Sequence, residues 1–163
     1  MKNIVLIGMM GCGKSTCGRL LAQRLGREFF DTDALIEARE GRTISDLFAA
    51  DGEEYFRTKE REIGEELARR QGLVIACGGG LPTRPKAIAP LKESGMVVFL
   101  NRDPEEIFAS VSMADRPLGQ AGKAAFLERF RQREPMYRQW ADVVISSRPL
   151  PEETVNDIME GIQ

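Results

Sequence analysis

Residues near the N-terminus have the types and spacing needed to cradle a chain of phosphates. Residues 8–15 (GMMGCGKS) fit the pattern G-x-x-x-x-G-K-[ST] and directly follow the apolar run at residues 4–7. Glycines at fixed offsets let successive backbone N–H groups turn inward, and the positive end of a following helix adds to the attraction for an anion. Lys14 would reach the β- and γ-phosphates, while the Ser15 hydroxyl would ligate Mg²⁺. The alternative is a glycine-rich turn that carries Lys-Ser by chance.

Two carboxylates close the second predicted strand of the chain. Asp31 and Asp33 would project from the carboxyl end of a parallel sheet, where open α/β folds bind ligands, and alternation along an extended segment would aim both the same way. One could help hold Mg²⁺ through water, and the other could accept a proton or a hydrogen bond from a substrate hydroxyl. The alternative is that Thr32 or Asp33 only caps the next helix. The chain has no histidine, so a carboxylate would have to accept the proton, and a histidine metal site is excluded.

A run of three glycines, Gly78-Gly79-Gly80, follows the strand predicted at residues 73–76. Glycines at the carboxyl end of a strand allow a ligand to approach the backbone closely, although a plain tight turn would need the same residues. Three arginines could bind an anion, namely Arg57, Arg116 and Arg133. Taken alone, each arginine is more typical of a solvated charged surface.

The elements that must position these residues alternate along the chain. Short β-branched runs separated by longer helical patterns are typical of βαβ units on a parallel sheet. Strands are predicted at residues 3–7, 28–31, 73–76, 96–100 and 142–146. Helices are predicted at residues 14–25, 33–40, 44–49, 53–70, 85–93, 104–111, 124–139 and 151–162. The sequence therefore predicts one α/β domain around a five-stranded parallel sheet.

Two local signals concern the ends of helices. Asp103-Pro104-Glu105-Glu106 supplies an aspartate N-cap, a proline at the first helical position and a glutamate at the third, which is a capping-box arrangement. Residues 115–123 carry a proline and two glycines between two predicted helices, which predicts a mobile stretch. Such a stretch could be a lid over a site or a solvated connector without a task.

Composition limits the class of protein. The 163 residues are enough for one well-buried domain, and 42% hydrophobic with 29% charged residues is ordinary for a soluble globular protein. The longest apolar run, residues 96–100, is far shorter than a membrane span, and the N-terminus enters a strand at once, so we expect no signal or transit peptide. A formal net charge of −2 argues against a nucleic-acid surface. We expect a cytoplasmic monomer.

The cysteines have no paired spacing. Cys12, Cys17 and Cys77 make an odd number, which points to free thiols in a reducing cytosol. Cys12 lies inside the phosphate motif, where a helix N-terminus and Lys14 could lower the pKa of its thiol. The alternative is a small residue that is tolerated in a tight loop.

The phosphate motif by itself does not separate a kinase from an ATPase, a GTPase or a nucleotide sensor. The order and spacing of the remaining motifs do, because together they resemble the shikimate kinase family over essentially the entire chain. The matching segments are GMMGCGKSTCG at residues 8–18, FDTD at 30–33, GEEYFR at 52–57, GGG at 78–80, DRPL at 115–118, REPMY at 133–137 and AD at 141–142. The resemblance implies a three-layer P-loop fold of the nucleoside-monophosphate-kinase type, with a substrate-binding region at about residues 33–61 and a lid at about residues 112–123.

The resemblance also implies roles on the acceptor side. Arg57 and Arg133 would hold the carboxylate of shikimate, a task that suits planar guanidinium groups. Asp33 would bind ring hydroxyls and take the proton from the attacking 3-hydroxyl. The backbone N–H of Gly79 would complete the substrate site.

On the donor side, the resemblance implies that Arg116 reaches from the lid to the transferring phosphoryl group, and that Lys14 contacts the same phosphates. Ser15 would ligate Mg²⁺, with Asp31 nearby and acting through water. The ATP-binding residues would be Gly11, Cys12, Gly13, Lys14, Ser15, Thr16, Arg116 and Arg148.

One departure from the family concerns adenine. The family usually has an arginine seven residues before the lid arginine, where it packs against the base, and Ala109 stands at that spacing here. The segment that contains Arg148 follows the last predicted strand, where the family lines the adenine pocket, so Arg148 would carry more of this contact.

The sequence therefore predicts an ATP-dependent shikimate kinase that forms shikimate 3-phosphate in aromatic amino-acid biosynthesis. Alternatives are another small-molecule kinase of similar fold, such as a gluconate or nucleoside monophosphate kinase, and a non-catalytic nucleotide sensor or switching hydrolase. A substrate panel with detection of ADP separates them.

Overall fold

The computed structural model describes residues 1–114 and 120–163, with side chains at residues 1–110 and 122–163. Within these residues, five strands form one sheet: β1 (Asn3–Ile7), β2 (Phe29–Asp31), β3 (Val74–Ala76), β4 (Gly95–Asn101) and β5 (Val143–Ser146). In the same described ranges, eight α-helices and one short 3₁₀ helix connect and cover the strands: α1 (Lys14–Leu25), α2 (Thr32–Glu40), α3 (Ile44–Asp51), α4 (Glu53–Ala68), η1 (Leu81–Thr83), α5 (Pro85–Ser94), α6 (Pro104–Ala114), α7 (Gln120–Trp140) and α8 (Pro151–Gly161).

All strand pairs are parallel, and the order across the sheet is β2-β3-β1-β4-β5. The chain leaves β1 toward β2 on one side, and it leaves β3 toward β4 on the other side. β1 and β3 are neighbours, so the two loops that follow them diverge and leave a crevice at the carboxyl end of the sheet. Ligands of open α/β sheets bind at such a switch point.

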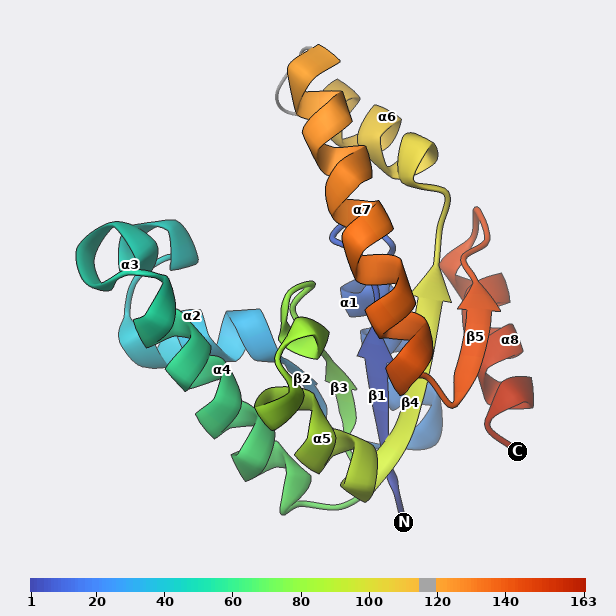
Figure 1. The fold of residues 1–163 in the computed structure, drawn as a ribbon. Helices are drawn as coiled ribbons and strands as arrows, with labels where there is room; N and C mark the ends of the chain where they lie inside the picture. Colours follow the sequence, from blue (N-terminus) through green and yellow to red (C-terminus); the bar gives the residue numbers. More distant parts are fainter. Residues whose placement is uncertain (115–119) are drawn as a thin grey trace.

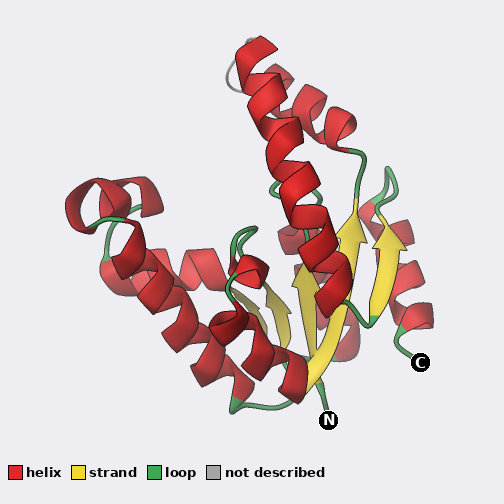
Figure 2. Ribbon diagram, viewed as in Figure 1, coloured by secondary structure: helices red, strands yellow, loops and turns green. Residues whose placement is uncertain are grey.

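Helices cover both faces of the sheet, which gives three layers (Figure 1). α1 and α8 pack against each other behind the sheet, while α4, α5 and α7 lie in front of it. α2 and α3 lie beyond the edge formed by β2, and α6 with the first turns of α7 extends past the carboxyl ends of the strands. Figure 2 shows loops gathered at this same end, where the strand arrows point. The three-layer α/β/α fold is confirmed.

The central strands read as continuous apolar runs because helices bury both of their faces. All residues of β1 and β3 are buried, whereas β5 alternates between half-buried and exposed positions as an edge strand. Asp142 sets the start of β5, since one carboxylate oxygen accepts from the Val97 N–H at 2.8 Å and the other from Lys92 Nζ at 2.6 Å. The AD segment singled out in the sequence thus orders the sheet edge.

The predicted elements are confirmed, with ends shifted by a few residues. The largest shift is in α7, which begins at Gln120 rather than at residue 124 and continues through Pro135. The predicted interval between the two helices, residues 115–123, is therefore wrong for residues 120–123, which are helical; residues 115–119 lie outside the described part of the chain.

Two caps explain where helices begin. The expected cap of α6 is present, since the Glu105 N–H donates to Asp103 Oδ1 at 2.9 Å. The cap of α2 is Asp31, whose Oδ1 accepts from the Ala34 N–H at 3.1 Å, so the alternative that Thr32 or Asp33 caps this helix is wrong. Asp33 in the first turn is left available for other contacts.

Candidate active site

The loop between β1 and α1, residues 8–15, is called the phosphate loop below. Gly11 and Gly13 have φ angles of 86° and 96°, a region in which L residues with a side chain are strained. Side chains hold several carbonyls of this loop: Lys14 Nζ donates to Gly8 O at 2.6 Å and Met9 O at 3.0 Å. Because α1 begins at Lys14, its first N–H groups face the inner side of this loop, which suits an anion.

Two further side chains each hold one more carbonyl of the phosphate loop. Arg102 Nη1 donates to Gly11 O at 2.9 Å, and Ser147 Oγ donates to Cys12 O at 2.9 Å. Arg102 follows β4, and Ser147 follows β5, so distant segments fix the shape of the loop.

Ser15 and Asp31 place two oxygens side by side next to this loop. Ser15 Oγ donates to Asp31 Oδ2 at 2.6 Å. Mg²⁺ prefers oxygen ligands, keeps several waters and is commonly held by one or two protein oxygens together with substrate phosphates. The Ser15–Asp31 pair fits that chemistry. Among the described residues, no group of three His, Cys, Asp or Glu side chains forms an all-protein metal site.

Asp33 is an unusual carboxyl group. Burial raises its pKa to about 6, the nearby charge of Asp31 adds to the rise, and Lys14 opposes it. Its Oδ1 atom is buried and has no hydrogen-bond partner among the residues that the structure describes. A carboxylate with a raised pKa beside a cleft is able to accept a proton near neutral pH.

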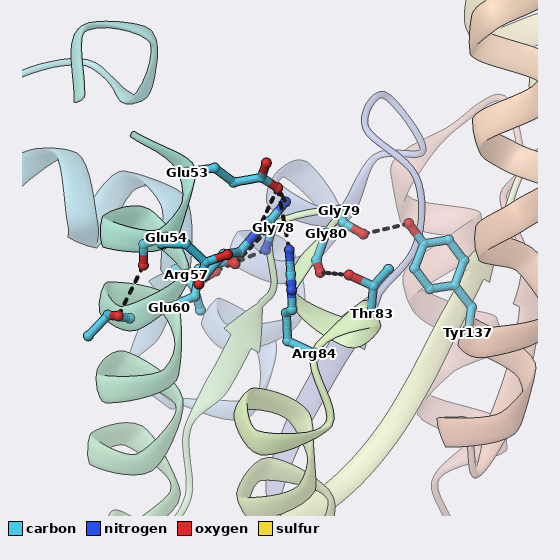
Figure 3. Close-up of polar contacts among 12 residues, drawn as sticks. Glu53, Glu54, Arg57, Glu60, Gly78, Gly79, Gly80, Thr83, Arg84 and Tyr137 are labelled. Atoms are coloured by element: carbon cyan, nitrogen blue, oxygen red, sulfur yellow. Dashed lines mark hydrogen bonds and ion pairs between the residues drawn. The ribbon is translucent and has the colours of Figure 1, made fainter. Parts of the chain in front are cut away.

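Hydrogen bonds from α2 and α7 hold the triglycine loop, Gly78-Gly79-Gly80. Thr32 Oγ1 accepts from the Gly78 N–H at 2.9 Å, and the Tyr137 hydroxyl donates to Gly79 O at 2.7 Å. Figure 3 shows the latter contact reaching across from α7. A Cβ on Gly78 would overlap the Asp33 carboxylate, so only glycine allows the loop to lie against this group.

Arg57 is held in an ion-pair network beside the triglycine loop (Figure 3). Its Nη1 lies 2.7 Å from Glu60 Oε1 and its Nη2 lies 3.2 Å from Glu53 Oε1, while Arg84 Nη2 lies 3.3 Å from the same Glu53 oxygen. Glu60 is 1% exposed, and burial raises its pKa although Arg57 opposes the rise. The guanidinium also lies over the Phe56 ring, 5.5 Å from its centroid.

Arg133 approaches the same loop from α7. A Cβ on Gly80 would lie 2.9 Å from Arg57 Nη1 and 3.3 Å from Arg133 Nη2, so the two guanidinium groups converge on Gly80. Two planar cations at one point suit a carboxylate ligand.

The phosphate loop, the two aspartates, the triglycine loop and Arg133 line one cleft of about 360 Å³, called the main cleft below. Its lining includes most of the residues predicted for the phosphates, the metal and the substrate: Gly11, Gly13, Lys14, Ser15, Thr16, Asp31, Asp33, Gly79 and Arg133. Arg57 stands at its margin, against Gly80. The size is that of a small-molecule site.

A second cleft of about 430 Å³, called the side cleft below, adjoins the phosphate loop and shares Gly13 and Thr16 with the main cleft. Cys12 and Arg148, both predicted to contact ATP, line it. The Arg148 guanidinium, however, lies 2.6 Å from Asp157 and 3.7 Å from Glu153 on α8. Arg116 lies outside the described residues.

Sequence reasoning missed several residues that position the site. Glu53 and Glu60 belong to a helix whose charges are typical of a solvated face, Arg84 carries no motif, and the REPMY segment gives no role to the Tyr137 hydroxyl. The i, i+3 spacing of Arg57 and Glu60 is an available signal, but it is shared with ordinary surface pairs. Arg102 had no signal, because its contact with Gly11 joins positions 91 residues apart.

The three cysteines are free and buried, as expected for unpaired thiols. Burial raises the pKa of Cys17 to about 11 and also raises the pKa of Cys77. Cys12 is 3% exposed. Its reactivity stays a prediction.

Comparisons with known proteins agree with this geometry. A family model described as shikimate kinase matches residues 10–163. Shikimate kinases of Symbiobacterium thermophilum and Persephonella marina are 41% and 39% identical; the alignments cover 99% and 100% of this chain and 96% and 100% of those proteins.

Solved structures give the same result. Shikimate kinase from Acinetobacter baumannii, in complex with shikimate, superimposes with a TM-score of 0.90 at 37% identity, over 99% of this chain and 93% of that one. A gluconokinase from Sinorhizobium meliloti, with a TM-score of 0.65 and 21% identity over 99% and 91% of the two chains, shares the fold. No helix in the described part of the chain has the length and apolar content required to cross a membrane.

Proposed function

The chain belongs to the shikimate kinase family, and we propose that its main cleft holds the ATP phosphates and shikimate side by side. The reaction is transfer of the γ-phosphate of ATP to the 3-hydroxyl of shikimate, which gives shikimate 3-phosphate and ADP in the shikimate pathway of aromatic amino-acid biosynthesis. One observation carries the assignment of sites: a single cleft joins the phosphate loop, the Asp33 carboxyl group and Arg133.

Asp33 is the proposed general base. As the 3-hydroxyl oxygen attacks the γ-phosphorus, its proton passes to the Asp33 carboxylate, and the bond from the γ-phosphorus to the β–γ bridging oxygen breaks to release ADP. Its pKa of about 6 leaves the group ionised at neutral pH yet basic enough to take a proton in the transition state. The substrate hydroxyls would also satisfy the buried Asp33 oxygen.

Arg57 and Arg133 are the proposed carboxylate clamp, and the Gly79 N–H is the proposed backbone donor. The convergence of both guanidinium groups on Gly80 supports this arrangement. Glu60 and Glu53 orient Arg57 in advance, so less side-chain entropy is lost when the substrate binds.

On the donor side, the proposed ATP contacts are the N–H groups of the phosphate loop, Lys14, Thr16 and Arg148. Phosphate oxygens would replace the carbonyls of Gly8 and Met9 as acceptors for Lys14, which neutralises charge during transfer. We assign the second such cation to Arg116 of the proposed lid, residues 112–123.

Mg²⁺ is the proposed metal of the metal–ATP co-substrate, ligated by Ser15 directly and by Asp31 through water. When bound, it neutralises charge on the phosphate oxygens. The 2.6 Å contact between Ser15 Oγ and Asp31 supports this position. We further propose one kinase domain, with residues 33–61 as the substrate-binding region, that works as a cytoplasmic monomer without nucleic-acid or membrane partners.

The purified chain should release ADP from MgATP in the presence of shikimate, and phosphorylated shikimate should be detected as the product. Gluconate and nucleoside monophosphates serve as competing acceptors. Faster ADP release with gluconate than with shikimate would contradict the proposed site. If no acceptor raised the rate of ADP release above the basal rate, a sensor or a hydrolase would be favoured.

A further inference from the structure

The side cleft extends the nucleotide site beyond the phosphates. It shares Gly13 and Thr16 with the main cleft, so a ligand whose phosphates lie in the phosphate loop would pass directly into it. Pro149, between β5 and α8, and Pro151, the first residue of α8, give the side cleft apolar surface, and Arg102 and Glu106 give it polar surface. A cleft lined by both kinds of surface suits a flat heteroaromatic base.

Arg102 is held in place by neutral partners. Nη1 donates to the backbone carbonyl of Gly11 at 2.9 Å, and Nη2 donates to Ser110 Oγ at 3.0 Å. The nearest carboxylate, on Glu106, lies 4.0 Å from Nε, at the limit of an ion pair, and the side chain is 29% exposed. No carboxylate of the described residues therefore compensates the guanidinium charge at close range. The two hydrogen bonds fix the orientation of the guanidinium plane.

Arg148 differs from Arg102 although both line the side cleft. Asp157 accepts from Arg148 Nε at 2.6 Å and from Nη2 at 3.2 Å, and Glu153 lies 3.7 Å from Nη1. Two carboxylates thus neutralise Arg148, whose side chain is 51% exposed. A cation already paired on three of its nitrogens has less to offer a new partner than one bonded to a carbonyl and a hydroxyl.

We propose that Arg102 is a nucleotide-binding residue that packs its guanidinium plane against the base of the nucleotide in the side cleft. Arginine is suited to this contact because its planar cation stacks on aromatic faces. The inference rests on the proposed function, since it assumes that the phosphate loop holds the phosphates of a nucleotide. It goes further in naming a base contact that comes from the end of β4.

The contact with Gly11 O gives Arg102 a second possible effect, on the shape of the phosphate loop. The two effects differ in the ligand they require. A base contact strengthens the binding of ADP and leaves inorganic tripolyphosphate, which has no base, unaffected. An effect on the loop alone changes the binding of both ligands equally, because both depend on the same N–H groups.

The test is calorimetric titration of ADP and of inorganic tripolyphosphate, both with Mg²⁺, into the wild-type protein and its variants. For Arg102→Ala, the Kd of ADP and the KM of ATP should rise roughly tenfold. The Kd of tripolyphosphate should rise much less than that of ADP, by only the share that the lost Gly11 contact contributes, and the KM of shikimate should stay unchanged. The matched control is Arg27→Ala, which also removes an arginine that donates to a backbone carbonyl, that of Lys2 at 2.9 Å, and should change none of these values.

A second variant, Arg102→Lys, keeps the charge and a donor for Gly11 but lacks the planar face. It should bind tripolyphosphate as the wild type does and bind ADP more weakly, and it carries the test if Arg102→Ala fails to fold. Equal weakening of ADP and tripolyphosphate in both variants would overturn the proposal in favour of a loop-shaping role, and wild-type ADP binding in Arg102→Lys would overturn the stacking contact. These titrations need no turnover, so a protein that binds ADP but ignores shikimate would contradict the proposed function alone.

Discussion

The acceptor side of the main cleft is built from charged side chains, whereas the phosphate loop is built from backbone. On the acceptor side, Arg57 lies between Glu60 and Glu53, and Asp33 is a carboxyl group made basic by burial. In the phosphate loop, side chains bind four backbone carbonyls, and the proposed ligand contacts are N–H groups. Under the proposed assignment, any phosphate chain could use such N–H groups, whereas the acceptor side would require a ligand with a matching carboxylate and hydroxyls. Selectivity for the acceptor and strength of phosphate binding would then come from different chemistry.

This comparison predicts that the largest loss of turnover follows the replacement of one carboxylate oxygen of Asp33. Asp33→Asn keeps the shape of the side chain and removes the base, so kcat should fall by roughly 10²- to 10⁴-fold. Steady-state assays with saturating shikimate measure kcat, and titration with ADP checks that nucleotide binding is retained. Near-normal turnover would show that another group takes the proton.

Arg57→Ala should affect the two substrates unequally. Loss of a charge-assisted contact should raise the KM of shikimate roughly ten- to a hundredfold and leave the KM of ATP nearly unchanged. Arg70→Ala is the control, since Arg70 pairs with Glu28 on the surface at 2.8 Å. An equal rise in both KM values would mean that Arg57 supports the fold, for example by partnering the buried Glu60.

Gly78→Ala tests whether the triglycine loop positions the base. The added methyl group would displace the Asp33 carboxylate, so kcat should fall about tenfold or more while ADP still binds. Gly64→Ala is the matched substitution: its Cβ would lie 2.6 Å from the Ala87 carbonyl, so it should lower the melting temperature and spare the kcat of the folded protein. If Gly78→Ala, like Gly64→Ala, lost stability but kept its kcat, the contact between Gly78 and Asp33 would not position the base.

The pH dependence should separate activity from stability at Asp33. Activity at limiting shikimate should fall about tenfold per pH unit below the Asp33 pKa of about 6, because the base becomes protonated. The folded pKa exceeds the unfolded value, so the stabilising effect of the neutral group is fully present below about pH 4 and is lost as the pH rises through about 6. Thermal unfolding at pH 5 and pH 8 should therefore show a smaller loss of stability with rising pH in Asp33→Asn than in the wild type. An identical loss in both proteins would refute the raised pKa.

The two sides of the cleft also differ in how much of them can be predicted. The phosphate loop is local in sequence, so its motif, strand and helix could be read directly, and the βαβ rhythm predicted the parallel sheet. The acceptor side joins residues from α2, α4, α7 and the triglycine loop. Its members could be named only through the resemblance to a family, because isolated arginines in charged helices look alike.

Contacts between distant segments could not be predicted from the sequence. Nothing in the order of residues pairs Tyr137 with Gly79 O, or Arg102 with Gly11 O. The cap of α2 was assigned to the wrong residues because Asp31, Thr32 and Asp33 are all good caps, and only the geometry of β2 decides among them.

The carbonyl contacts of the phosphate loop have a consequence for the order of events during synthesis. Arg102 and Ser147, which hold two of these carbonyls, directly follow the last two strands of the sheet. A nascent chain that has only the motif lacks both contacts. We therefore expect nucleotide binding to develop only after β4 and β5 have joined the sheet, so that unfinished molecules would not compete with finished ones for the cell's nucleotide.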